Sequence, residues 1–212
     1  MEKVQDWKPL LEAASSDIRR LDYVVRYSSI PVTVPENDST HMYWVSVYSM
    51  MVHRRLRGPR ECDALIMQHA LTHDALECLS GDIVRTFKYS SEEFRSAVNK
   101  AEKGLADTLP TEVRSLLDEV QNGFSLNETM AHYVQDVVKA ADFMSLYQYM
   151  WREKKRGNSE IDPFFGRMIA DLKSAAVGHR SASGLLEDTE YRSSLAALYE
   201  SMAEGFAQRF TV

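Results

Sequence analysis

The chain has 212 residues, of which 44% are hydrophobic and 26% are charged, and its formal net charge is −6. This length suits one domain, and the composition is ordinary for a soluble globular protein. The negative charge argues against a protein whose main role is to coat nucleic acid, although a local basic pocket could still hold a small anion.

Nothing in the sequence predicts a membrane or a secreted protein. No apolar run approaches the roughly 18 residues that cross a bilayer, and the N-terminal residues lack the apolar core of a secretory signal. The two cysteines, Cys62 and Cys78, form no evident disulfide framework. We therefore expect a cytoplasmic protein with reduced thiols, in the cytoplasm of a host if the gene is viral.

The first predicted element is an amphipathic helix over residues 7–25, where apolar side chains recur at helical spacing. Residues 26–39 contain two prolines and several turn-forming residues, and they predict an extended loop. A strongly apolar helix is expected over residues 41–56, and apolar side chains nearly all around it indicate a buried central element. His41 lies in the first turn of this helix, where its ring can face a cavity.

A second core helix is predicted over residues 61–79, and it carries His73, Asp74 and Glu77. Since a helix advances about 100° per residue, His73 and Glu77 at positions i and i+4 share a face. Imidazole and carboxylate groups together suit a divalent transition metal that keeps open positions for water or substrate. A bare His-Asp pair is more often a solvated polar face, so the remaining residues must decide between the two interpretations.

The rest of the chain predicts more helices and no strands, so we expect an all-α fold. The predicted helices cover residues 90–109, 110–121, 128–155, 162–177 and 187–210, with an irregular connection at 82–89 and a loop at 178–184. We predict one domain over residues 1–212, with a core of about 20–150 and C-terminal helices of 160–212 packed on it. Such a domain can bring polar residues from several helices to one internal site.

Four short motifs follow one another along the chain. They are Arg26-Tyr27 in a loop, Glu36 to His41 at a helix start, His73 to Glu77 with Ser80-Gly81-Asp82, and Ala140-Ala141-Asp142. Together they resemble the HD-domain metal phosphohydrolase superfamily, and within it the bacterial 5′-deoxynucleotidases with their phage relatives that hydrolyse deoxynucleoside triphosphates. The resemblance implies an HD-type helical bundle with a metal site between its central helices.

The resemblance implies a single divalent metal ion held by His41, His73, Asp74 and Asp142. Two imidazoles and two carboxylates leave positions for water and phosphate. The ion would orient the attacking water, lower its pKa and offset the phosphate charge. The motifs do not name the metal, so manganese, cobalt, zinc, iron and magnesium all stay open.

The remaining motif residues receive catalytic and substrate-binding roles from the same resemblance. Glu77 would take or relay the proton of the water, and Asp82 would contact the sugar or help to position the water. Arg26 would grip the phosphate with its planar guanidinium. Tyr27 would pack against the base or sugar, where family members often carry tryptophan, and Lys88 would add a second phosphate contact.

The implied activity is hydrolysis of deoxynucleoside 5′-monophosphates to deoxynucleoside and phosphate. A deoxynucleoside triphosphohydrolase of the phage dATPase type stays open, because residues 83–87 lack the proline usual in deoxynucleotidases and Arg85 adds a charge there. A non-catalytic nucleotide-binding protein is the third alternative. We expect a deoxynucleotide substrate, no nucleic-acid polymer, no membrane, and a homo-oligomer, a dimer or larger.

Overall fold

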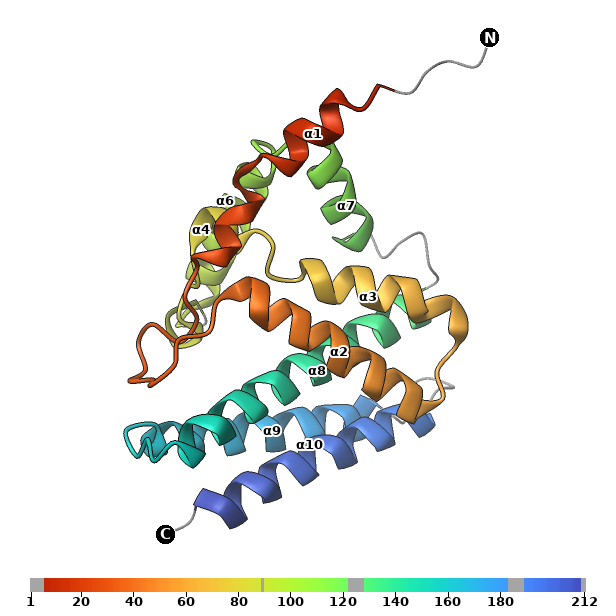
Figure 1. The fold of residues 1–212 in the computed structure, drawn as a ribbon. Coiled ribbons are helices and arrows are strands. Elements are labelled where there is room, and N and C mark those ends of the chain that lie inside the picture. Colours follow the sequence, from red (N-terminus) through yellow and green to blue (C-terminus); the bar gives the residue numbers. More distant parts are fainter. Residues whose placement is uncertain (1–5, 89, 122–127, 183–188, 211–212) are drawn as a thin grey trace.

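The computed structural model of the protein describes residues 6–88, 90–121, 128–182 and 189–210 (Figure 1). Within these ranges the regular structure is helical, and the only strand-like feature is an isolated antiparallel bridge between Val25 and Asn37. The all-α prediction is therefore confirmed. No helix within the described ranges has the length and apolar character needed to cross a membrane.

Ten α-helices and two 3₁₀ helices make up this part of the chain. They are α1 Lys8–Ala14, η1 Asp17–Asp22, α2 Asp38–Leu56, η2 Arg60–Cys62, α3 Asp63–Thr72, α4 Glu77–Ser80, α5 Arg85–Lys88, α6 Glu92–Ala106, α7 Thr111–Gln121, α8 Glu128–Lys155, α9 Asp162–Ala182 and α10 Thr189–Phe210.

The centre of the fold is the packing of α2 against α8 and α3 (Figure 1). The main apolar core lies around them and includes fully buried Val45, Ile66 and Val137. Helix α10 packs on α9 and on α8, and it adds Leu195 to the same core. A smaller core, with buried Cys78 among its members, lies on the other side, under η1, α4 and α7. Two apolar clusters thus enclose the N-terminal end of α2.

Helix α2 begins three residues earlier than predicted, because Asn37 caps it. The Asn37 side chain accepts a hydrogen bond from the Thr40 backbone N–H at 2.9 Å, which satisfies a donor that the first turn leaves open. The expectation of a helix buried all around is wrong. Tyr43 and Met51 are more than half exposed, so α2 buries one face and leaves the other to solvent.

The predicted helix over residues 7–25 is divided into α1 and η1. Two serine side chains end α1 by bonding to its carbonyl groups. The Ser15 hydroxyl donates to the Leu11 carbonyl at 3.0 Å, and the Ser16 hydroxyl donates to the Ala13 carbonyl at 2.7 Å. Serine competes in this way with the helical hydrogen-bond ladder, so apolar spacing alone overestimated the length of the helix.

The predicted continuous helix over residues 61–79 is also broken, at the His-Asp pair. Helix α3 ends at Thr72, and α4 begins at Glu77. The His73 ring nitrogen Nδ1 lies 2.8 Å from the Ala70 carbonyl oxygen, which the next turn of an α-helix would need. The Glu77 N–H instead bonds three residues back, to the Asp74 carbonyl at 2.9 Å. His73 and Asp74 therefore lie in a tight turn, and Glu77 begins a short helix.

At the C-terminal side, the loop predicted from residue 178 is helical up to Ala182. Contacts with α10 hold this last turn of α9. Arg180 forms a two-point ion pair with Glu200 at 2.9 and 2.6 Å, and the His179 ring stacks on Tyr199. The predicted start of the last helix at residue 187 lies outside the described residues, as do residues 122–127 between two other predicted helices.

Candidate metal centre

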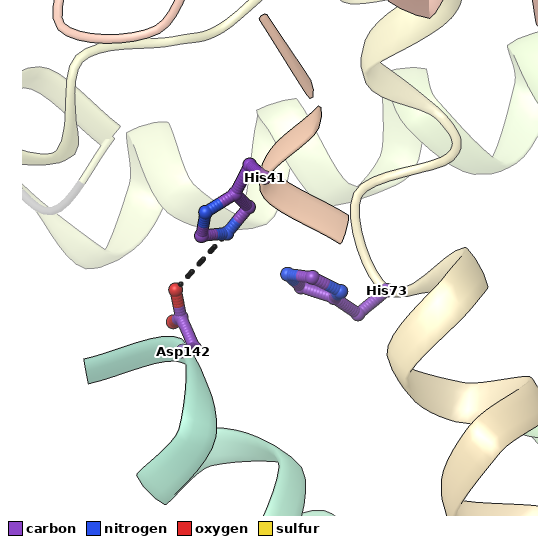
Figure 2. A group of neighbouring side chains, drawn as sticks. All are labelled: His41, His73 and Asp142. Atoms are coloured by element: carbon purple, nitrogen blue, oxygen red, sulfur yellow. Dashed lines mark ion pairs between the residues drawn. The ribbon is translucent and has the colours of Figure 1, made fainter. Parts of the chain in front are cut away.

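Three side chains from separate parts of the fold converge beside the N-terminal end of α2 (Figure 2). His41 comes from the first turn of α2, His73 directly follows α3, and Asp142 lies in the middle of α8. One ligand atom of each lies within 4.8 Å of the others. The His41 Nε2 atom is 3.3 Å from Asp142 Oδ1, and the two ring centroids are 5.4 Å apart.

Asp74 completes the group of four predicted metal ligands. Its Oδ2 atom lies 3.2 Å from His73 Nε2 and 3.8 Å from His41 Nε2. The two nitrogens therefore meet a carboxylate from the turn after α3, and His41 also meets the carboxylate of α8. The structure brings all four side chains together although the predicted helix that carried two of them is broken.

Hydrogen bonds orient both imidazoles with Nε2 toward this cluster. The His73 Nδ1 atom must carry a proton, because the Ala70 carbonyl that it contacts only accepts. His41 Nδ1 lies 3.2 Å from the Ser145 hydroxyl and 3.7 Å from the Glu36 carboxylate, which favours a proton there as well. Both Nε2 atoms are buried and have no hydrogen-bond partner within the described ranges. In a neutral imidazole with the proton on Nδ1, the Nε2 atom carries the lone pair that binds a metal.

The donor set fits a divalent transition metal. Nitrogen and oxygen ligands bind such ions at about 2.0–2.2 Å, so neighbouring ligand atoms lie roughly 3.0–3.5 Å apart. The distances of 3.2 and 3.3 Å from His73 Nε2 to Asp74 and from His41 Nε2 to Asp142 match this spacing. Two imidazoles with two carboxylates suit manganese, iron, cobalt and zinc better than calcium.

Neighbouring charges tune the ligands. Burial alone would raise the pKa of Asp142, but Lys139 and then His41 outweigh it and hold that pKa well below the ordinary value. Burial would lower the pKa of His41, yet its contacts with Asp142 and Glu36 raise it. Asp142 is therefore an anion at neutral pH, which is the form that binds a cation.

A second acidic group lies directly beside the first and surrounds Arg26. Oxygen atoms of Asp38, Asp74 and Glu77 lie within 4.8 Å of one another. The Arg26 Nη1 atom donates to Asp74 at 2.7 Å and to Asp38 at 3.1 Å, and it is 3.9 Å from Glu77. Asp74 thus lies between the Arg26 guanidinium and the two histidines. A phosphate bound at this place would contact both Arg26 and the proposed metal site.

Glu77 differs in its protonation from an ordinary surface glutamate. Burial, followed by the nearby charges of Asp74 and Asp38, raises its pKa to about 10. Burial likewise raises the pKa of Asp38, against the influence of Arg26. A divalent cation beside Asp74 would act in the opposite direction, because it stabilises the anion. Glu77 is thus placed to hold or release a proton next to the cluster.

Asp82 and Tyr27 form a backbone contact at the edge of this group. Gly81 has a positive φ of 72°, which suits glycine and turns the chain so that Asp82 Oδ2 accepts the Tyr27 backbone N–H at 3.0 Å. Tyr27 itself has φ of 58° and stacks on Tyr149 at 4.7 Å between centroids. Its hydroxyl is buried and has no hydrogen-bond partner among described atoms.

Lys88 takes a different position from the four ligands. Its Nζ atom donates to the Glu102 carboxylate of α6 at 2.9 Å, which ties the short helix α5 to α6. The side chain of Arg85, on the same short helix, lies outside the description. The predicted role of Lys88 as a second phosphate contact stays a prediction.

Sequence reasoning missed four residues of the site. They are Glu36 and Asp38, to which the motifs assign no role of their own, and Lys139 and Ser145, which lie outside the motifs. Helical spacing could have found three of them, because Asp38 precedes His41 by three residues, and Lys139 and Ser145 lie three residues on either side of Asp142.

Cavity size does not identify this site. A cavity of about 1230 Å³ lies between α2, α8 and α10, and none of the predicted site residues lines it. A smaller cavity of about 290 Å³ reaches His73 from the side of α7 and is also lined by His69 and Gln135. Burial, with a smaller effect of His73, lowers the pKa of His69 to about 4, so this neighbour is neutral. We identify the site by its donor atoms.

The chain matches known proteins over most of its length. The family model described as 5′-deoxynucleotidase YfbR-like covers residues 15–181. The chain is 29% identical to the 5′-deoxynucleotidase HDDC2 of Xenopus laevis over 162 residues, which are 72% of this chain and 77% of the relative. It is 26% identical to a 5′-deoxynucleotidase of Klebsiella pneumoniae over 165 residues, which are 74% and 80% of the two chains.

A solved structure has the same fold. The HD phosphohydrolase DatZ of cyanophage S-2L, in a structure bound to dA and one catalytic Zn²⁺ ion, superposes with a TM-score of 0.57. The sequences are 17% identical, and the match covers 89% of this chain and 95% of the phage chain. Because the family model covers well over half of the residues, the protein belongs to the YfbR-like 5′-deoxynucleotidase family.

Proposed function

We propose that the protein is a metal-dependent phosphohydrolase that converts deoxynucleoside 5′-monophosphates to deoxynucleosides and orthophosphate. The observation that carries this proposal is the pair of buried Nε2 atoms of His41 and His73, each facing a carboxylate, with Arg26 directly beside them. Imidazole and carboxylate hold the cation, and a guanidinium binds phosphate with two parallel donors. The names of the relatives agree with this chemistry.

In this proposal His41, His73, Asp74 and Asp142 hold the metal. When bound, the ion supplies Lewis-acid polarisation, which offsets phosphate charge and makes water more acidic. The protein supplies the other parts. Arg26 orients the phosphate against Asp74. A cation held by Asp74 would oppose the raised pKa of Glu77 and favour its ionised form, and that carboxylate would accept the proton of the attacking water. It can then return that proton to the leaving 5′-oxygen.

The nucleoside would lie on the side of Tyr27 and Asp82. The Oδ2 atom of Asp82 accepts a hydrogen bond from the Tyr27 backbone N–H. Asp82 would therefore position the tyrosine and would also contact a hydroxyl group of the sugar. The Tyr27 ring is already held by its stack on Tyr149. A side chain held in this way offers a preformed apolar surface to a base or a deoxyribose.

The test is phosphate release from ribo- and deoxynucleoside mono- and triphosphates. Metal-stripped protein would receive Mn²⁺, Co²⁺, Zn²⁺, Fe²⁺ or Mg²⁺ separately. We expect metal-dependent release of orthophosphate from deoxynucleoside monophosphates and little from ribonucleotides. Turnover of triphosphates instead, with dATP preferred, would replace the proposal by the triphosphohydrolase alternative. Tight nucleotide binding without turnover under any metal would favour the non-catalytic alternative.

The expected assembly is a homo-oligomer, a dimer or larger, in the cytoplasm. The exposed apolar side chains of α2 are compatible with self-association, since Tyr43 and Met51 remain more than half accessible in one chain. Light scattering of the eluted protein would measure its mass. A monomer at micromolar concentration would refute this part of the proposal and leave the activity untouched.

A further inference from the structure

The outer oxygen of the Asp142 carboxylate is bound by a lysine. Lys139 lies three residues before Asp142 on α8, and its Nζ atom is 2.5 Å from Asp142 Oδ2. The other oxygen, Oδ1, is 3.3 Å from His41 Nε2. In Figure 2 the Oδ2 atom points away from His41. One carboxylate thus separates a buried imidazole from a cation.

Exposure increases along this line of three groups. The His41 side chain is fully buried, that of Asp142 is 22% exposed, and that of Lys139 is 51% exposed. The cluster is therefore closed at α2 and reachable from the side of Lys139. Arg26, the other cation of the site, is only 13% exposed, and it already donates to two carboxylates. A phosphate that approaches from solvent meets the lysine first.

The charges of the site call for a second cation. The carboxyl groups of Glu36, Asp74 and Asp142 contact the two imidazoles, and those of Asp38 and Glu77 lie beside Asp74. A phosphate monoester brings a charge of about −1.5 to −2 at pH 7, so the ionised carboxylates among these groups, such as Asp142, repel it. Within the described residues, the cations other than the imidazoles that form ion pairs with these carboxyl groups are Arg26 and Lys139.

The lysine can serve both Asp142 and a substrate. An ammonium group has three donors on a flexible four-carbon stem, so one N–H can stay on Asp142 Oδ2 while another turns to a phosphate oxygen. The ammonium group also lies over the ring of Phe143, with Lys139 Nζ 5.2 Å from the ring centroid. Asp142 would keep Oδ1 for the metal.

We propose that Lys139 binds a non-bridging oxygen of the substrate phosphate and is the second phosphate-binding cation beside Arg26. This inference rests on the proposed phosphohydrolase function. It assigns to α8 the phosphate contact that sequence reasoning gave to Lys88, whose Nζ atom donates to Glu102 on α6.

The test compares Lys139→Met with the matched control Lys155→Met. Lys155 is an exposed lysine of the same helix, and it also lies over an aromatic ring, that of Trp151 at 4.9 Å. Three quantities would be measured on folded protein: KM for a deoxynucleoside monophosphate, the inhibition constant of orthophosphate, and the dissociation constant of Mn²⁺. A charge-assisted hydrogen bond corresponds to roughly 10-fold to 100-fold in binding.

We expect Lys139→Met to raise KM and the orthophosphate inhibition constant by about 10-fold to 100-fold, with Mn²⁺ binding unchanged or tighter. Lys139→Arg should recover most of the loss, and Lys155→Met should behave as wild type. If Lys139→Met weakened Mn²⁺ binding while orthophosphate inhibition stayed unchanged, the lysine would only position Asp142, and the inference would be overturned.

Failure of the proposed function would be visible separately. If the wild-type protein hydrolysed none of the nucleotides, calorimetry of orthophosphate binding to the Mn²⁺-loaded wild type and Lys139→Met would still compare the two proteins. Weaker phosphate binding by the variant supports the phosphate site without the activity. Equal binding by both proteins refutes the role of Lys139.

Discussion

Among the residues of the site, Glu77 is the one whose protonation most affects the proposed chemistry. Replacement by glutamine keeps the size of the side chain and removes its capacity to accept a proton. We expect Glu77→Gln to lower kcat by about 10²-fold to 10⁴-fold, the usual contribution of a general base, while the metal content by elemental analysis stays the same. Full activity of this variant with metal retained would refute the proton-transfer role.

The Ser145 hydroxyl acts on the metal through His41. It lies 3.2 Å from the Nδ1 atom of the imidazole and holds the ring with Nε2 toward the cluster. We expect Ser145→Ala to weaken metal binding about 10-fold to 100-fold, as is typical when the partner of a liganding histidine is removed. Titration of metal-stripped protein with Co²⁺ would measure this.

Ser49→Ala is the control for that change. Ser49 is fully buried on α2, and its hydroxyl has no hydrogen-bond partner among the residues described. Both variants therefore lose a buried hydroxyl, but only Ser145 contacts a proposed ligand. Equal Co²⁺ affinity in the Ser145 variant, the Ser49 variant and the wild type would contradict the orienting role of Ser145.

At the scale of single residues, the sequence predicts the proposed metal ligands better than it predicts the residues that orient them. His41, His73, Asp74 and Asp142 belong to spaced motifs, so a single sequence was enough to propose them. The contact of Ser145 with His41 joins two residues, on α8 and α2, that are 104 positions apart in sequence. No local pattern encodes such a pair, because it depends on how α8 lies against α2.

Among the elements, the end of α8 fixes the loop that carries Arg26 and Tyr27. Glu153 is fully buried, and its carboxylate accepts hydrogen bonds from the Thr33 N–H at 2.5 Å and from the Thr33 hydroxyl at 2.8 Å. The Tyr149 hydroxyl, one turn earlier, donates to the Val34 carbonyl at 2.8 Å. The same helix therefore supplies Asp142 to the cluster and holds the loop next to it.

Glu153 should make the stability of the protein sensitive to acid. Burial would raise the pKa of Glu153, but the Thr33 backbone and the other donors lower it to about 2. A carboxyl group whose folded-state pKa is lowered stabilises the fold above its unfolded pKa of about 4.3, and this contribution is lost as pH falls toward about 2. We expect Glu153→Gln to destabilise the protein by about 1–3 kcal/mol at pH 7.

Thermal unfolding between pH 7 and pH 3 would test this prediction. The difference between wild type and Glu153→Gln should shrink below about pH 4.3, because the unfolded wild-type chain then binds a proton at Glu153 while the folded carboxylate stays ionised until about pH 2. Glu200→Gln is a suitable control, since Glu200 forms an exposed ion pair with Arg180, and exposed pairs contribute little. A constant difference between the wild type and Glu153→Gln over this range would contradict the assignment.

Element boundaries were predictable where a local signal sets them. The range of α8, Glu128–Lys155, is the predicted one, and Ser91 caps α6 by accepting the Phe94 N–H at 3.1 Å. The break at His73 was not predictable from apolar spacing, since it results from an imidazole that takes a helical carbonyl. A functional side chain here overrides the local helical preference.

For the whole molecule, the metal should join parts that are distant in sequence. Its proposed ligands belong to α2, to the turn after α3 and to α8. A ligand that binds only the folded state stabilises it by about 2.7 kcal/mol at a hundred times its dissociation constant. For a chain of this size we expect the melting temperature to rise by roughly 5–10 °C.

Calorimetry of metal-stripped and metal-loaded protein would measure the rise. Asp142→Asn should largely abolish it, because the amide is a poor ligand. We propose that residues 1–212 form one domain, and a single transition in both samples is expected on that basis. Two transitions, of which one is insensitive to metal, would contradict the one-domain proposal.

At the scale of the whole molecule, the motif order was sufficient to predict the fold class and the family. For α9 and α10, the sequence predicted only that two helices with apolar residues cover the core, and it did not predict how they pack. The cavity between α2, α8 and α10 had no signal in the sequence, since it depends on the gap that three particular helix faces leave between them.

Helices α2 and α8 contact each other near the site and again about 18 Å along α2, at 1.5 Å per residue. His41 lies beside Ser145 at one end, and His53 Nδ1 lies 2.7 Å from the Tyr133 hydroxyl at the other. A Cβ atom at Gly58 would overlap both of these last side chains. These two contacts, at separate points along α2, restrict sliding of one helix along the other. We therefore expect a larger residue at Gly58 to change the distance between His41 and Asp142, although the glycine lies 17 positions from His41 in the sequence.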